Sequence, residues 1–497
     1  MQLHQNKVKY NTRGLDISVR RALYCAKKQC STRQLGRSMI NLTGAKVLVV
    51  GLGDTGLSMA RWLVRRGAIV HVVDTREAAP HQRIIQDKYP QIALALGRMP
   101  KEWVEAADMI AVSPGIDRRG GLIAKAAARG TPVVGDIELF SQWLNQGSSS
   151  PQVIAITGSN GKSTVTAMTS SICNAAGRPA LMAGNFGLPV LDALMAVEDG
   201  VKEPEVYVLE LSSFQLESTF SLKPDAATVL NLSEDHLDRY ADMDEYAQAK
   251  GRIYQNGRYH IFNREDQWSN TLSRSGVSRV SFGLDIPHEA ESWGMTGHGK
   301  EAYLCRGSTE ILALNQMSVT GLHNAANAIA SGALCRAIGI EDYAIIKGLI
   351  QFKGLPHRVE KIDSFQNVDF YDDSKGTNVG ATVAALKGML QPVILIAGGD
   401  GKAQDFNALA TAVRECARAI VLIGRDAPQI AELIGGDFSV HFAADMAEAV
   451  ELAYQLANSG DAVLLSPACA SYDMYRSYVH RAEVFVSAVS ALKRGQS

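Results

Sequence analysis

A glycine-rich turn with a lysine and two hydroxyl residues, Thr157–Thr164 (Thr-Gly-Ser-Asn-Gly-Lys-Ser-Thr), is the segment of this sequence best suited to bind phosphate. It separates a short apolar run from a helical pattern, so backbone N–H groups and the positive end of a helix dipole would face the phosphate. Lys162 would neutralise β/γ-phosphate charge, and Ser163 or Thr164 would place a hydroxyl on Mg²⁺. The general motif has a glycine where this chain has Ile156, and the alternative is an ordinary strand-to-helix turn with a solvent-facing lysine.

A second glycine-rich turn, Gly51-Leu-Gly-Asp-Thr-Gly56, follows an apolar run and precedes another helical pattern, with Asp74 about twenty residues further on. Taken alone, this spacing predicts a dinucleotide site in which Asp74 holds the adenosine ribose. An NAD-dependent oxidoreductase is therefore a competing hypothesis, but it leaves the Thr157–Thr164 turn unexplained.

The elements that would position both turns follow the alternation of short apolar runs and helical patterns that is typical of parallel α/β sheets. We predict three successive α/β domains: a Rossmann-like N-terminal domain (39–140), a central P-loop ATPase-like domain (141–354) and a Rossmann-like C-terminal domain (355–497). Expected strands include 46–50, 69–73, 109–112, 133–134, 153–156, 206–209, 368–371, 393–397, 419–423 and 462–465. The polar stretch 145–151 is a candidate linker.

Length and composition agree with this organisation. The chain has 497 residues, which suggests about three domains. Hydrophobic residues make up 46%, and 50 Lys+Arg balance 51 Asp+Glu, so the chain has no overall basic field for nucleic acid. Its longest apolar runs are too short to span a bilayer. Seven cysteines form no CxxC pair, which favours a reducing cytoplasm and inert thiols over disulfides or structural zinc.

The first forty residues differ in composition, with nine Lys or Arg against one acid, Asp16. A transit peptide, a basic tail and an over-long reading frame that should start at Met39 are all compatible with this pattern. We exclude residues 1–38 from the predicted fold.

The turn at 157–164 and a series of further motifs, in order along the chain, resemble the Mur ligases, the ATP-dependent peptide-bond-forming enzymes of peptidoglycan precursor synthesis. The resemblance covers about residue 41 to the C terminus, and Ile156 is typical of the family. The further motifs are Gly184-Asn-Phe-Gly-Leu-Pro189, Leu209-Glu-Leu-Ser-Ser-Phe-Gln215, Asn231-Leu-Ser-Glu-Asp-His-Leu-Asp-Arg-Tyr240, Ala249-Lys250, Gly321-Leu-His-Asn-Ala-Ala-Asn327, Gly354-Leu-Pro-His-Arg358, Asp372-Asp-Ser-Lys-Gly-Thr-Asn378, Gly398-Gly-Asp-Gly-Lys402 and Ser466-Pro-Ala-Cys-Ala-Ser471.

The resemblance implies ATP and Mg²⁺, with two ions expected, and CO₂ as a lysine carbamate. Glu210, which would otherwise be an exposed acid at a strand end, is expected to bind Mg²⁺, and His236 becomes a metal ligand or its neighbour. Lys250, by pattern a solvated lysine on a helix, is expected to be carbamylated and to help hold the metal. The implied ATP-binding residues are Gly158, Ser159, Asn160, Gly161, Lys162, Ser163, Thr164, Asn185, Asn324, Asn327, Arg358 and Asp373; the metal set is Ser163, Glu210, His236 and Lys250; the catalytic set is Lys162, His236, Lys250, Asp373 and Lys375.

Within the family the chain is most similar to members that add D-glutamate to UDP-N-acetylmuramoyl-L-alanine. The absence of an Asp-Asn-Pro-Arg stretch favours glutamate over diaminopimelate or lysine, although a relative that adds another amino acid stays an alternative. Asp373 could hold the ribose or assist the amine. The expected glutamate-binding residues are Thr377, Lys402, Ser471, Tyr472 and Tyr478; those for the UDP group are Asp54, Thr55, Asp74, Thr75, Arg76, Ser113 and Gly115.

The resulting hypothesis is a cytoplasmic, monomeric ligase that acts through an acyl phosphate on small-molecule substrates, without nucleic acid or membrane span. A catalytically inactive nucleotide-binding regulator is disfavoured because Lys162, Glu210, His236 and Lys250 are all present. We also expect domain closure about hinges near residues 140 and 354, which would bring Arg358 to the phosphates.

Overall fold

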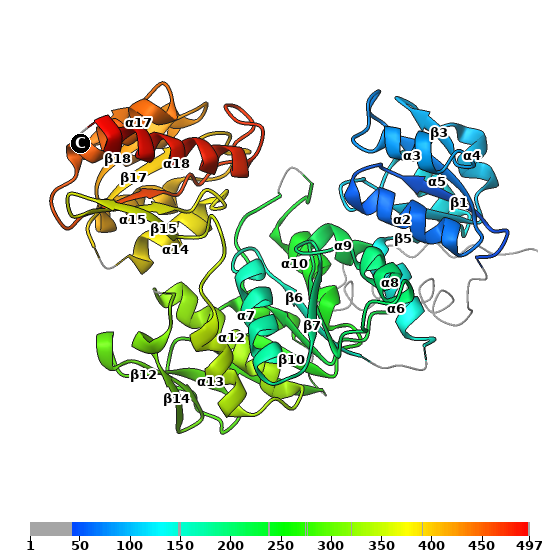
Figure 1. The fold of residues 1–497 in the computed structure, drawn as a ribbon, viewed down its shortest axis with the longest axis horizontal. Helices are drawn as coiled ribbons and strands as arrows, with labels where there is room; N and C mark the ends of the chain where they lie inside the picture. The colour runs from blue at the N-terminus through cyan, green and yellow to red at the C-terminus, as the bar shows by residue number, and fades with distance from the viewer. Residues whose placement is uncertain are drawn as a thin grey trace, which may run out of the picture. The chain divides into compact units, whose positions relative to one another are not determined.

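A computed structural model describes residues 42–147, 151–236, 239–273, 275, 277–319, 321–389 and 391–495. The basic segment 1–38 and the start-site hypothesis at Met39 lie outside these residues. The described chain is mixed α/β with three largely parallel sheets, which confirms the predicted fold class. It forms two compact units, one ending at Glu138 and the other beginning at Leu139 (Figure 1). The domain boundaries expected at 140 and 354 stay predictions.

The first unit contains a five-stranded parallel sheet in the order β3-β2-β1-β4-β5. Its core is formed by β-branched and leucine side chains of the strands against α4 and α5. The elements are β1 (Lys46–Val50), α2 (Asp54–Arg65), β2 (Ile69–Asp74), α3 (Gln82–Lys88), β3 (Ala93–Leu96), α4 (Lys101–Ala106), β4 (Met109–Val112), α5 (Gly121–Ala128) and β5 (Val133–Val134), with α6 (Asp136–Leu144) next in the chain.

The second unit begins with a nine-stranded sheet in the order β14-β13-β12-β11-β10-β9-β6-β8-β7. Strands β12, β13 and β14 pair antiparallel, which the sequence did not predict because these strands lack a clear apolar run. The strands are β6 (Gln152–Thr157), β7 (Ala180–Gly184), β8 (Val206–Glu210), β9 (Ala226–Val229), β10 (Tyr259–Asn263), β11 (Ser278–Phe282), β12 (Trp293–Thr296), β13 (Tyr303–Arg306) and β14 (Thr309–Ala313).

Helix α7 (Lys162–Ala175) packs against both α12 (Leu322–Ala337) and α13 (Asp342–Gln351), and these helices share one core with the sheet (Figure 1). Burial on several sides holds the start of α7, and with it the phosphate loop, in place. The other helices of this region are α8 (Val190–Glu198), α9 (Ser213–Glu217), α10 (Met243–Gly251) and α11 (Gln267–Leu272).

The third sheet has the order β15-β16-β20-β17-β18-β19, with β15 antiparallel to β16. Helices α14, α15 and α16 pack on one face, and α17 and α18 on the other. The elements are β15 (Glu360–Phe365), β16 (Val368–Asp372), α14 (Val379–Gly388), β17 (Val393–Gly398), α15 (Asn407–Cys416), β18 (Ala417–Ile423), α16 (Ala427–Ile434), β19 (Val440–Phe442), α17 (Met446–Leu456), β20 (Ala462–Leu465) and α18 (Tyr478–Gly495).

Two further expectations concern membranes and thiols. No helix of the described ranges is both long and apolar enough to cross a bilayer. The five cysteines in those ranges are free, and all but Cys416 are buried.

The α7–α13 contact predicts a specific defect. A Cβ at Gly348 would lie 2.4 Å from Cα of Ile172, so Gly348→Ala forces two backbones apart. We expect the free energy of unfolding of the variant to fall by about 1–3 kcal/mol, measured by urea unfolding. The steric cost exceeds the stabilisation that alanine gains over glycine from its higher helix propensity. Gly495→Ala, where nothing lies within 4 Å of the new Cβ, is the matched control and should be neutral. Equal stability of both variants would contradict this account.

Candidate active site

The phosphate loop lies where β6 ends and α7 begins. Gly158 and Gly161 adopt φ values of 155° and 82°, a region that L side chains rarely adopt. A Cβ at Gly161 would lie 2.6 Å from Oδ1 of Asn327, so this close approach requires glycine. The N-cap residue of α7 is Gly161, which has no side chain to bond to the first N–H groups of the helix. The backbone N–H groups there are therefore suited to hold an anion.

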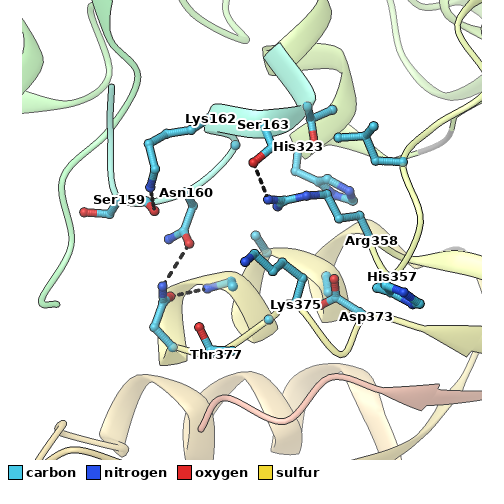
Figure 2. Close-up of a pocket in the computed structure, with 18 of the residues that line it drawn as sticks. Ser159, Asn160, Lys162, Ser163, His323, His357, Arg358, Asp373, Lys375 and Thr377 are labelled. Carbon is cyan, nitrogen blue, oxygen red and sulfur yellow. Dashed lines mark hydrogen bonds between the residues drawn. The ribbon is translucent and has the colours of Figure 1, made fainter. Parts of the chain in front are cut away.

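A cavity of about 630 Å³ opens beside this loop (Figure 2). It is formed by segments before and after residue 354, and most residues predicted for ATP, the metal and the amino acid line it. Those residues are Ser159, Asn160, Gly161, Lys162, Ser163, Thr164, Asn185, Glu210, His236, Asn324, Asn327, Arg358, Asp373, Lys375, Thr377, Lys402 and Tyr478.

Two lysines converge on one backbone carbonyl of the loop. Nζ of Lys162 donates to the carbonyl oxygens of Gly158 and Ser159, each at 2.9 Å, and Nζ of Lys250 donates to that of Gly158 at 2.8 Å. Lys250 is only 2% exposed, so the pattern-based expectation of a solvated lysine is wrong. Burial lowers the pKa of both lysines, and the nearby Lys162 charge lowers the pKa of Lys250 further.

Glu210 is the last residue of β8 and is buried, rather than following the strand as expected. Its Oε1 accepts a 2.7 Å hydrogen bond from Nδ2 of Asn185, and its Oε2 is buried with no hydrogen-bond partner among the described residues. A buried carboxylate oxygen without a partner is costly unless a cation or ligand group binds it. Hard oxygen ligands of this kind suit Mg²⁺.

His236 has a left-handed backbone conformation with φ of 57°. Its ring contacts the ring of Phe214, with 4.8 Å between centroids, and its Nε2 lies 3.6 Å from Oδ2 of Asp235. Burial lowers the pKa of His236, while Asp235 opposes the shift. The imidazole is therefore poised in its neutral form, which is the form that could bind a metal or its water.

Arg358 reaches the phosphate loop from the far side of the cavity. Its Nη2 donates to Oγ of Ser163 at 2.8 Å, so this structure already has the guanidinium beside the loop (Figure 2). Asp373, directly after β16, is buried and accepts a 2.6 Å hydrogen bond from Oγ of Ser466. Burial raises the pKa of Asp373 to about 7. The cavity thus contains a carboxyl group that can exchange a proton near neutral pH.

Lys375, Thr377 and Tyr478 lie together in the cavity, and Nζ of Lys375 is 3.8 Å from the ring centroid of Tyr478. Burial and the nearby Arg358 lower the pKa of Lys375 to about 8. Lys402 is exposed at the cavity rim and has a left-handed φ of 51°. Cations at both positions could hold the carboxylates of an acidic amino acid.

Ser471 and Tyr472 are not brought into this cavity. Ser471 is buried in the segment after β20, where its carbonyl oxygen accepts the N–H of Tyr475 at 2.7 Å, whereas Tyr472 is 76% exposed. Their proposed contact with the amino acid stays a prediction.

The seven residues predicted for the UDP group belong to the first unit. The carboxylate of Asp74 is occupied: it accepts from the N–H of Leu52 and from the backbone and guanidinium of Arg76, at 2.7–2.9 Å. The hydrogen bond from the Arg76 side chain contributes most to lowering the pKa of Asp74 to about 2. Asp74 therefore organises the loop after β1 in this structure, which weakens the hypothesis that it holds a dinucleotide ribose.

The other UDP-site candidates lie around the same loop. Oγ of Ser113 donates to the carbonyl oxygen of Gly51 at 3.2 Å, and a Cβ at Gly51 would lie 2.9 Å from that hydroxyl. Asp54 begins α2 and pairs with Nε2 of His81 at 2.7 Å. Thr55 lies in the first turn of α2, Thr75 follows β2, and Gly115 lies in the turn after β4.

Five cavity residues with polar side chains were inside the quoted motifs but had no predicted role: Asn231, Asp235, His323, His357 and Asn378. Burial lowers the pKa of His323 to about 4, and Nδ1 of His357 lies 2.7 Å from Oδ2 of Asp372. In the sequence, the clue to their presence in the cavity was that they neighbour residues with predicted roles. That clue could not reveal their contacts, which depend on the packing of segments distant in the sequence.

The raised pKa of Asp373 predicts a pH effect on stability. The pKa of the Asp373 carboxyl is about 7 in the folded protein and 3.8 in the unfolded chain. The bound proton therefore contributes fully to the free energy of unfolding below pH 3.8, and this contribution is lost as the pH rises through about 7. We therefore expect the free energy of unfolding of Asp373→Asn, relative to that of the parent, to rise by about 2 kcal/mol as the pH rises from about 5 to about 8, measured by urea unfolding. Asp363→Asn is the control, because Lys493 lowers the pKa of Asp363 and its effect falls below this range. A constant difference for Asp373→Asn would contradict the raised pKa.

Comparison with protein families gives three matches in chain order. A model described as the Mur ligase MurD-like N-terminal domain matches residues 45–135, the Mur ligase middle domain matches 156–335, and the Mur ligase glutamate ligase domain matches 357–469.

Among curated proteins, the UDP-N-acetylmuramoylalanine–D-glutamate ligase of Methylobacillus flagellatus is 50% identical over 92% of this chain and 99% of that relative. The ligase of the same name from Thiobacillus denitrificans is 52% identical over 91% of this chain and 98% of its own length.

Solved structures share the fold at low sequence identity. MurF ligase from Thermotoga maritima in complex with ADP gives a TM-score of 0.58 at 14% identity, over 92% of this chain and 96% of that one. UDP-N-acetylmuramate-alanine ligase MurC from the same organism gives a TM-score of 0.55 at 17% identity, over 90% of this chain and 100% of that one. Because all three family models match in order and relatives of about half-identical sequence span nearly the whole chain, the chain belongs to the Mur ligase family.

Proposed function

We propose that this chain is an ATP-dependent ligase that adds D-glutamate to UDP-N-acetylmuramoyl-L-alanine, as a monomer in the cytoplasm. The observation that carries the proposal is a single cavity in which the phosphate loop faces Arg358, Lys375, Thr377 and Lys402. Such a cavity can hold a nucleoside triphosphate beside an acidic amino acid. The names of the half-identical relatives support this pair of substrates.

The chemistry requires activation because a carboxylate is a poor electrophile. Transfer of the γ-phosphoryl group of ATP to the alanine carboxylate gives ADP and an acyl phosphate. The glutamate amine then attacks the carbonyl carbon, the bond from that carbon to the phosphate oxygen breaks, and the amide and inorganic phosphate are formed. Lys162 and Arg358, which both lie at the phosphate loop, would stabilise negative charge on the transferred group.

The incoming amine must lose a proton before or during its attack. Asp373 lies in the cavity and titrates near pH 7, so it is suited to take up that proton. Lys375 and Lys402 would hold the carboxylates of the amino acid, and Thr377 would donate its hydroxyl. This assignment chooses the second of the two roles that the sequence left open for Asp373.

The residues around Glu210 fit Mg²⁺. The carboxylate oxygen Oε2 of Glu210 is buried and without a partner among the described residues, and the hydroxyl of Ser163 lies in the same cavity. We propose that these two groups bind the metal, with His236 as a ligand or hydrogen-bonded to a metal-bound water. Bound Mg²⁺ would neutralise phosphate charge. Asn185 orients Glu210 by donating to its other oxygen.

Carbamylation of Lys250 is a further part of the proposal. Its Nζ lies beside the phosphate loop, within 3.4 Å of Oγ1 of Thr157 and 2.8 Å of the Gly158 carbonyl. Addition of CO₂ to the neutral amine forms an N–C bond and releases one proton, which replaces a buried cation with an anion. An anion there would complete the set of oxygen ligands for the metal.

The first experiment measures phosphate release with Mg-ATP and UDP-N-acetylmuramoyl-L-alanine in the presence of different amino acids. We expect turnover with D-glutamate, and rates lower by about 100-fold or more with L-glutamate, L-alanine, L-lysine and meso-diaminopimelate, because each leaves a charged group of the cavity unpaired or misplaced. Turnover with another amino acid would assign the chain to a neighbouring reaction. No turnover with any of them would contradict the proposal.

A second experiment tests the carbamate. Lys250→Ala should lower kcat by about 100-fold or more, and added formate or acetate should restore part of it by supplying the missing carboxylate. Lys223→Ala, a lysine exposed outside the cavity, is the control and should need no rescue. Full activity of Lys250→Ala at low bicarbonate, or no rescue at any carboxylate concentration, would refute the carbamate.

A further inference from the structure

The N-terminal turn of α14 lies between the phosphate loop and the segment that carries Lys402. Asn378 is the N-cap of this helix, and its Oδ1 accepts the N–H of Ala381 at 2.9 Å. The other end of the same amide, Nδ2, donates to Oδ1 of Asn160 in the phosphate loop at 3.1 Å. Because a serine or aspartate could cap the helix equally well, capping alone does not account for the contact with Asn160.

The helix backbone fits closely against the phosphate loop at this point. A Cβ at Gly380 would lie 3.1 Å from Nδ2 of Asn160 and 3.1 Å from Oγ of Ser233. That distance is shorter than ordinary van der Waals contact, so there is no spare room for a methyl group. A shift of Asn160 would therefore be transmitted to the helix by direct contact as well as by the hydrogen bond.

The opposite side of the same turn is bonded to the segment 401–404, which contains Lys402. The N–H of Val379 donates to Oε1 of Gln404 at 3.0 Å, and Nε2 of Gln404 donates to the carbonyl oxygen of Gly401 at 2.8 Å. Thr377 directly precedes the cap. Figure 2 shows Asn160 and Thr377 on facing elements of the cavity. One helical turn thus contacts the phosphate loop, directly follows Thr377 and is bonded to Gln404, two residues after Lys402.

We propose that Asn378 is a positioning residue that couples the phosphate loop to the amino-acid pocket. The Asn160–Asn378 hydrogen bond sets the place of the first turn of α14, and through it the places of Thr377 and Lys402. A nucleotide that orders the phosphate loop thereby also orders the amino-acid pocket. This inference rests on the proposed function, because it takes Thr377 and Lys402 as the groups that hold the amino acid.

A double-mutant cycle tests the coupling. Asn378→Ser keeps a capping oxygen but is too short to reach Asn160, so it should raise KM for the amino acid about three- to tenfold while changing KM for Mg-ATP less than about twofold. In an Asn160→Ala background, where the hydrogen bond is already lost, the same substitution should raise KM for the amino acid less than about twofold.

The matched control is Asp445→Ser, which replaces the side chain that caps α17 in the same way but does not line the cavity. It should change thermal stability by about as much as Asn378→Ser and leave both KM values unchanged. Gly380→Ala provides a second route, because it keeps the cap and the hydrogen-bonding groups but inserts a methyl group at the contact. It should also raise KM for the amino acid.

An unchanged KM for the amino acid in both Asn378→Ser and Gly380→Ala would overturn the inference, as would equal effects of Asn378→Ser in the two backgrounds. The cycle is measured with whichever amino acid supports turnover of the parent enzyme. Turnover with an amino acid other than D-glutamate would therefore overturn the substrate assignment and still decide the coupling. No turnover with any amino acid would overturn both.

Discussion

The carbonyl oxygen of Gly158 accepts hydrogen bonds from two lysine ammonium groups, and this shared contact explains much of the surrounding structure. Lys162 and Lys250 come from different helices, yet the half-buried Lys162 and the buried Lys250 both donate to the same loop. Burying like charges together is unfavourable unless an anion is bound or a proton is lost. Glu210 and Asp235 supply part of the compensation, and a triphosphate would supply more. The site is thus built for a polyanion before any substrate binds.

Sheet topology brings the remaining groups to the same place. β6 and β8 are adjacent parallel strands, so the phosphate loop and Glu210 lie at neighbouring carboxyl ends. In the third sheet Asp373 likewise follows β16, and Ser466, which donates to it, follows the adjacent strand β20. Ligands of open α/β sheets generally bind outside these strand ends. Two sheets of one compact unit therefore direct their reactive edges at one cavity.

Much of this could be predicted from sequence because local signals were strong. The apolar runs of β6, β8 and β17 and the glycine-rich turn defined strands, a helix start and a phosphate site. Resemblance to a family then grouped distant motifs. Burial of Lys250 was missed because the pattern of α10 is compatible with an exposed face, and only packing against the loop decides otherwise. The antiparallel strands β12–β14 were missed because their short sequences have little periodicity. The role of Asn378 required an inter-segment hydrogen bond that no local pattern encodes.

The hydrogen bond between Ser163 and Arg358 joins residues 195 positions apart in the chain. During synthesis at about 5–20 residues per second, the phosphate loop would therefore exist for about 10–40 s before its arginine partner is made. Loop closure over such a separation must precede any gain from the contact, so completion of the cavity is expected to be a late step of folding. A nascent or truncated chain that ends before residue 358 would contain the phosphate loop and Glu210 but would lack Arg358 and every residue proposed for the amino acid.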